Sequence, residues 1–306
     1  MKRLFIPFCA LTMLGGCVDV DIDAEEAGPV VEFDPSNSII PLPNNLLFDP
    51  GGSGRLALPE GCNESPTEAA IRVGILNQLD GFGTFKPAAS ITFTSPVEAA
   101  SVVDRLKLFQ RTDGATNIDP LISQEVPLQF FPGTTTRDSA DCSTTTTVAN
   151  MTIVPAVPLN DNSIYTYVLL NGVEDENGNA YLPAPTWALV RQAENPVTVE
   201  NGAVVAETTP LNPANPTDLE TLLGISTLWN AHASALSFLD EAVDVPREDI
   251  LLAWDMKTQT VTAPLDADVE GSLANTLPTT TPLLGMAGPG MDAIAEADGV
   301  VDAVFE

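Results

Sequence analysis

The chain has 306 residues, 44% of them hydrophobic, and it carries a formal net charge of −30 at pH 7. That length allows one large or two ordinary domains with a sizeable core. Because so acidic a surface repels nucleic-acid phosphates, we expect no nucleic-acid partner. We also expect no direct binding to anionic lipid through a basic patch.

A secretory signal is predicted at residues 1–16. Two basic residues near the start are followed by the apolar run Leu4–Leu14, which is too short to span a bilayer as a stable helix. The sequence LGGC that ends at Cys17 resembles the lipobox of bacterial lipoproteins. In that family the signal is cleaved before the cysteine, which then carries several acyl chains, enough for stable membrane attachment. The resemblance implies a lipid anchor on Cys17 and a membrane as partner; a plain signal peptide is the alternative.

The acidic stretch 17–28 is interpreted as a lipidated tether. In the resembled lipoproteins an aspartate directly after the lipidated cysteine favours the inner membrane, whereas this chain has Val18 at that position. The resemblance therefore implies an outer-membrane lipoprotein on the periplasmic or cell-surface side.

Prolines dominate the next segment, FDPSNSIIPLPNNLLFDP at 33–50. Its four prolines oppose a helix, and those at 41 and 43 bias the residues before them to extended backbone. We expect an extended apolar segment punctuated by Asn-Asn and Asp-Pro turns.

Two cysteines remain beyond Cys17, namely Cys62 and Cys142. They are expected to form a disulfide, because a protein with a secretory signal folds in an oxidising space. On the chain-entropy model the bond contributes about 4 kcal/mol. Two free thiols are the alternative. Neither cysteine has a second cysteine or a histidine at ligand spacing, so we expect no metal site there.

A short helix is predicted from Ser65. Ser65 and Glu68 have the spacing of a capping box. Ile71, Ile75 and Leu79 follow four residues apart and are expected to form the buried face of this helix.

Alternating apolar and polar residues predict a series of strands, and the turn signals between them favour an antiparallel sandwich. The segments are 89–97, 105–110, 126–131, 144–159 and 163–173.

The stretch 152–190 resembles bacterial Ig-like modules, in which an Asp-x-x-Gly-Asn turn follows a strand. Here that turn starts at Asp175. A helix-loop-helix calcium site needs glycine at its sixth position, where this chain has Ala180, so the turn is interpreted as structural.

Residues 193–216 are interpreted as a polar, proline-rich loop or linker. The longest predicted helix follows at 217–242, with Thr217 and Glu220 at capping-box spacing. A returning strand is predicted within 245–261.

The sequence carries no catalytic signature. It has no G-x-S-x-G, no phosphate-binding loop, no dinucleotide fingerprint and no H-E-x-x-H. The single histidine, His232, falls on the apolar face of the long predicted helix and is expected to be a packed or half-buried residue. We assign no catalytic residue, cofactor or metal ligand. The acid excess is interpreted as promoting solubility, with calcium binding as the alternative.

Four stretches together resemble the N-terminal domain of bacterial virulence-factor-type extracellular lipases, over residues 33–261. They are 33–48, 76–93, 152–190 and 247–261. In that family an α/β-hydrolase domain that acts on lipid esters follows this domain. Glu306 lies about where that domain would begin, so we expect either the front of a longer lipase or a stand-alone lipoprotein.

The expected fold is mainly β, an Ig-like antiparallel β-sandwich with two packed or inserted helices. Residues 29–192 and 217–261 would form it, and 262–306 would be a linker toward a C-terminal domain. The resemblance implies a non-catalytic, membrane-tethering accessory domain of a surface lipase, with a C-terminal hydrolase domain as partner. The alternative is a stand-alone outer-membrane lipoprotein with a binding or adhesion role.

Overall fold

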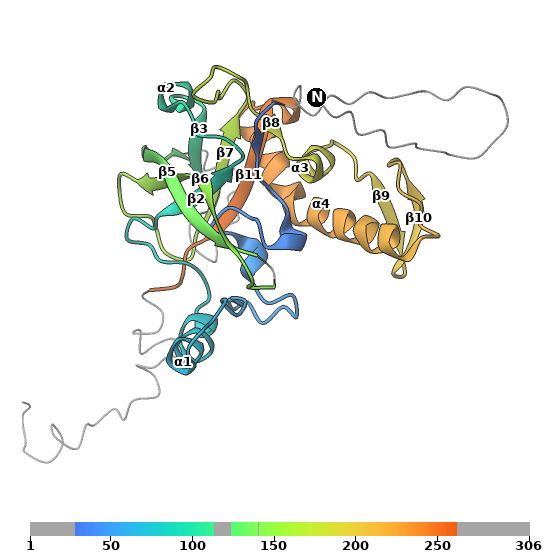
Figure 1. The fold of residues 1–306 in the computed structure, drawn as a ribbon, viewed down its shortest axis with the longest axis horizontal. Helices are drawn as coiled ribbons and strands as arrows, with labels where there is room; N and C mark the ends of the chain where they lie inside the picture. The colour runs from blue at the N-terminus through green and yellow to red at the C-terminus, as the bar shows by residue number, and fades with distance from the viewer. Residues whose placement is uncertain (1–27, 113–123, 140, 262–306) are drawn as a thin grey trace, which may run out of the picture.

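Strands are the main element of the fold. The computed structural model describes residues 28–112, 124–139 and 141–261. In this part of the chain the strands form three sheets, and helices lie beside and below them (Figure 1). The expected mainly β fold, a β-sandwich with helices, is therefore confirmed.

The first sheet has the strand order β5–β6–β2–β1–β8. Its strands are β1 (Val30–Val31), β2 (Ala89–Phe93), β5 (Leu128–Asp138), β6 (Thr145–Pro155) and β8 (Leu182–Pro183). Neighbours are antiparallel except β1 and β8, which are parallel. Along β2 every second residue is buried, which is the alternation that the sequence predicted.

The second sheet has the order β11–β7–β3–β4 and is antiparallel. Its strands are β3 (Leu106–Gln110), β4 (Gln124–Glu125), β7 (Ile164–Leu170) and β11 (Ile250–Lys257). Five consecutive residues of β7 and the first five of β11 are buried, so both faces of this sheet are covered. Tyr167 and Trp254 are register partners, and their rings stack with centroids 4.7 Å apart. Side chains of both sheets and of the long helix share one core cluster.

Over the described ranges four α-helices accompany the sheets, α1 (Pro66–Gly74), α2 (Ala99–Val102), α3 (Pro185–Val190) and α4 (Pro216–Ala242). Helix α4 buries Ile225, His232 and Leu239, which is the face that its sequence predicted. It packs against α3 and β11. The expected Thr217–Glu220 capping box is wrong, because the side chain of Asn215 accepts the N–H of Thr217 instead and Pro216 occupies the first turn.

Helix α1 forms where expected but does not bury its apolar face. The capping box of Ser65 and Glu68 is present. However, α1 ends at Gly74 and has no buried residue, and Ile71 and Ile75 are 45% and 58% exposed. The prediction of a core-facing stripe is therefore wrong. Local capping is enough to form this helix, which projects from the body of the fold in Figure 1.

Residues 193–216, interpreted as a loop or linker, contain a β-hairpin, which corrects that interpretation. Its strands are β9 (Val197–Glu200) and β10 (Ala203–Glu207). The turn is Asn201-Gly202, and both residues have positive φ, 52° and 80°. An Asn-Gly turn between alternating valines is the strongest local hairpin signal. Val197 is fully buried and forms a second small core with Leu222 and Ile225 of α4.

The proline-rich segment 33–50 is only partly extended. It contains two single-turn 3-10 helices, Pro35–Asn37 and Asn45–Leu47, and two more occur at Leu76–Gln78 and Arg247–Asp249. The buried side chain of Asn44 accepts the N–H of Leu46 at 2.9 Å and so starts the second turn. Asn45 then accepts the backbone N–H of Lys257 at 2.7 Å, which fastens this segment to the end of β11.

Candidate functional site

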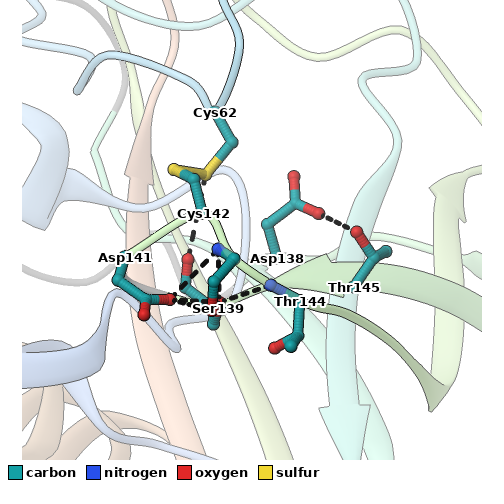
Figure 2. The surroundings of a disulfide bond; sticks show 8 residues. Cys62, Asp138, Ser139, Asp141, Cys142, Thr144 and Thr145 are labelled. Atoms are coloured by element: carbon teal, nitrogen blue, oxygen red, sulfur yellow. Dashed lines mark hydrogen bonds between the residues drawn. A yellow bond between two sulfur atoms is a disulfide. The ribbon is translucent and has the colours of Figure 1, made fainter.

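The two cysteines expected to pair are joined in the structure. Cys62 and Cys142 form a disulfide with an S–S distance of 2.01 Å and a Cα–Cα distance of 5.5 Å (Figure 2). Cys142 lies in the turn between β5 and β6, and Cys62 lies in the segment before α1. The bond therefore attaches the tip of the long β5–β6 hairpin to the segment that leads into α1.

Hydrogen bonds to Asp141 shape the turn that presents Cys142. The hydroxyls of Ser139 and Ser143 donate to its carboxylate at 2.6 and 2.7 Å, and the backbone N–H of Ser143 donates at 3.1 Å. These bonds, that of Ser139 first, lower the pKa of Asp141 to about 2. The carboxylate is thus ionised over the whole neutral range. Cys142 itself has φ of 57°, a left-handed conformation that tight turns require.

His232 is a core residue, as its place on the helix face predicted. Its ring meets Trp187 and Phe33 edge-on, with centroids 5.3 and 5.7 Å away. Nδ1 lies 2.8 Å from the carbonyl oxygen of Leu228, which can only accept, so this nitrogen carries the proton. Burial lowers the pKa of His232, so the ring is neutral at pH 7. Nδ1 therefore bonds to a carbonyl oxygen of its own helix and not to a nucleophile.

N–H groups of the following turn residues donate to the carboxylate of Asp175 and stabilise the turn. Oδ1 accepts the backbone N–H groups of Asn177 and Asn179 at 2.9 and 2.8 Å, and Oδ2 accepts the side-chain amide of Asn179 at 3.1 Å. These bonds, led by the backbone N–H of Asn179, lower the pKa of Asp175. Within residues 28–112, 124–139 and 141–261, no group of three or more His, Cys, Asp or Glu side chains could hold a metal ion.

An ion pair links the outer face of the second sheet to α4. The guanidinium of Arg111 donates to Asp255 of β11 and to Ser234 of α4. Thr166 of β7 donates to the other oxygen of Asp255 at 2.7 Å. Because the guanidinium of Arg111 bonds to both Asp255 and Ser234, it connects α4 to the sheet.

A groove lies between the β9–β10 hairpin and α4, with a volume of about 470 Å³. The helix contributes Leu223, Ser226, Thr227 and Asn230, which fall at i, i+3, i+4 and i+7 and so share one face. The other wall is the run 195–199 at the start of the hairpin, apart from Pro196. Sequence reasoning missed this groove because it interpreted the hairpin as a loop; the Asn201-Gly202 turn was the available signal.

The predicted lipidation residue, Cys17, lies outside the described residues. Among the described helices, none combines the length and the apolar character needed to cross a membrane.

Comparisons with known proteins leave the family open. No family model matches the chain, and no curated protein matches it. Among solved structures, the N-terminal part of the bacterial S-layer protein SbsC shares 19% identity over 32% of this chain and 19% of that one, with a TM-score of 0.18. Domains 1–6 of the same S-layer protein share 17% identity over 32% of this chain and 11% of theirs, also with a TM-score of 0.18. The chain therefore spans less than a fifth of these structures.

Proposed function

We propose that this chain is the non-catalytic N-terminal domain of a surface-exposed bacterial lipase, where it tethers a lipid-ester hydrolase domain to the outer membrane. The observation that carries the proposal is where the described chain enters and leaves the fold. It enters at β1, at one end of the sheets, and leaves after β11, at the opposite end (Figure 1). The segment that leads back to Cys17 and the segment that leads on to Glu306 thus start at opposite ends of the fold.

Hydrogen bonds fix the direction in which the chain leaves the sandwich after β11. Thr258 is fully buried, accepts the N–H of Ser163 at 2.9 Å and donates to the carbonyl of Asn160 at 2.7 Å. The next residue, Gln259, donates its backbone N–H to the carbonyl of Phe82 at 2.7 Å. Asp80 then accepts the backbone N–H of Thr260 at 2.9 Å. The described chain therefore leaves the fold in a fixed direction as far as Thr260.

Within the described residues, side chains that could take part in acid–base chemistry have packing roles instead. His232 bonds to its own helix, and Arg111 pairs with Asp255. We therefore expect the purified chain to hydrolyse no short-chain ester above the blank. Hydrolysis that is lost on mutation of one serine would contradict the proposal.

The decisive experiment is the intact mass of the native protein. It would be taken from bacterial membranes with an antibody raised against this domain, from cells with the natural gene and from cells with Cys17→Ala. A membrane-bound product that is larger than this chain by a whole domain supports the proposal. A mass equal to the chain from Cys17 plus acyl chains overturns the lipase role and leaves a stand-alone lipoprotein. Unchanged membrane binding of Cys17→Ala overturns the lipid tether.

A further inference from the structure

We propose that the groove between the β9–β10 hairpin and α4 binds a neutral saccharide. The proposal concerns a different part of the molecule from the tether and does not depend on the lipase role. The volume of the groove, about 470 Å³, lies within the range of about 300 to 1,000 Å³ that small-molecule sites occupy.

The absence of charged lining residues in the groove favours an uncharged ligand. None of its lining residues is charged, although the chain as a whole carries −30. Without a basic side chain the groove has no partner for an anion. Without a carboxylate it also has no counter-ion for a cation. A ligand that fits must make hydrogen bonds without a net charge.

The polar groups of the groove are oriented before a ligand arrives. Asn195 accepts the backbone N–H of Val197 at 3.0 Å and donates from its amide to the hydroxyl oxygen of Ser226 at 3.1 Å. This bond connects the hairpin to α4. Because Ser226 accepts this hydrogen bond, its own hydroxyl hydrogen stays available to a ligand. Ser226 is only 5% exposed, so its side chain is held in place. Fixed polar groups reduce the entropy that binding costs.

Both walls of the groove carry hydrogen-bonding side chains. Thr227 donates its hydroxyl to the carbonyl of Leu223 at 2.9 Å, so toward the groove it offers an acceptor. Asn230 and Thr198 are exposed, and within the part of the chain that the structure describes their side chains make no hydrogen bond. These groups can both donate to and accept from hydroxyls.

Apolar side chains complete the chemistry. Val199 and Leu223 are half-buried and lie in the same groove as the polar groups. A pyranose ring presents hydroxyls around its edge and C–H groups on its faces. It therefore matches a wall of neutral hydrogen-bonding groups next to aliphatic side chains, which a uniformly apolar ligand does not.

The test starts with the full chain on an array of neutral oligosaccharides of glucose, galactose and N-acetylglucosamine, with sialylated versions and uncharged glycine-serine peptides beside them. The strongest saccharide is then titrated by calorimetry. We expect neutral saccharides to bind and sialylated ones to bind more weakly. No binding to any neutral saccharide, or binding to the peptides alone, overturns the proposal.

Matched threonines on α4 place the ligand in the groove. Thr227 and Thr221 both donate their hydroxyls to the carbonyl four residues before, at 2.9 and 3.0 Å, but only Thr227 lines the groove. Thr227→Val should raise Kd by about 3- to 10-fold, the effect of one lost neutral hydrogen bond, and Thr221→Val should leave it unchanged. Thr198→Val on the hairpin wall should act like Thr227→Val. Equal affinities of all three variants would place any binding elsewhere and overturn the proposal.

Discussion

Replacing Cys62 and Cys142 together by serine should lower the free energy of unfolding by about 4 kcal/mol. The disulfide joins residues 80 apart in sequence, and a cross-link of this span removes much conformational entropy from the unfolded chain. For a domain of this size each kcal/mol shifts the melting temperature by about 2 to 4 °C, so Tm should fall by about 8 to 16 °C.

The assay is thermal unfolding followed by circular dichroism, for the natural chain and the double-serine variant, each with and without a thiol reductant. Reduction should bring the natural chain to the melting temperature of the variant and should not move the variant. The native fold should survive, because the turn next to Cys142 is also held by Asp141. A natural chain whose melting temperature does not change on reduction would refute the loop-closure reasoning. So would a variant that responds to the reductant as strongly as the natural chain.

Three further predictions concern the core, the interior histidine and the Asp175 turn. Trp187→Ala should cost about 3 to 5 kcal/mol in urea unfolding because Trp187 is fully buried, whereas Phe85→Ser, at a residue 81% exposed, should stay within about 0.5 kcal/mol. Burial lowers the pKa of His232, so as pH falls below 6.5 the unfolded chain takes up a proton at this residue before the folded chain does. The free energy of unfolding should therefore decrease in this range, and His232→Phe should remove that part of the pH dependence. An equal pH dependence in both proteins would contradict this. Asp175→Ala should lower Tm, and millimolar calcium should leave the natural Tm unchanged, because protein N–H groups already bond both carboxylate oxygens; a rise with calcium would count against this reading of the turn.

Much of the fold could be predicted from local patterns. The period-two alternation along 89–93 marks a strand with one buried face, and β2 has that pattern. The capping box at Ser65 formed as predicted because it needs only residues three apart. The buried face of α4 was also readable, since the spacing of Ile225, His232 and Leu239 matches the helical repeat.

The errors arose where a local pattern was taken as evidence of packing. Ile71 and Ile75 have helical spacing, yet no other element covers them. Asn215 and Thr217 both lie at the start of α4, and the structure selects the one that precedes Pro216. The groove could not be predicted from spacing alone, because it exists only where the hairpin lies against the helix.

The sequence by itself determined elements whose causes are local, such as the alternating strand β2 and the capping box of α1. It also contains no catalytic motif. It also indicated the partner of Cys62, because only Cys142 remained once the signal and the predicted lipidation residue Cys17 were set aside. Tertiary structure alone decided that the apolar residues of α1 stay exposed, which strands are neighbours and where the chain leaves the fold. The parallel pairing of β1 with β8 brings together residues about 150 apart, and contacts at such separations depend on the packing of the whole chain.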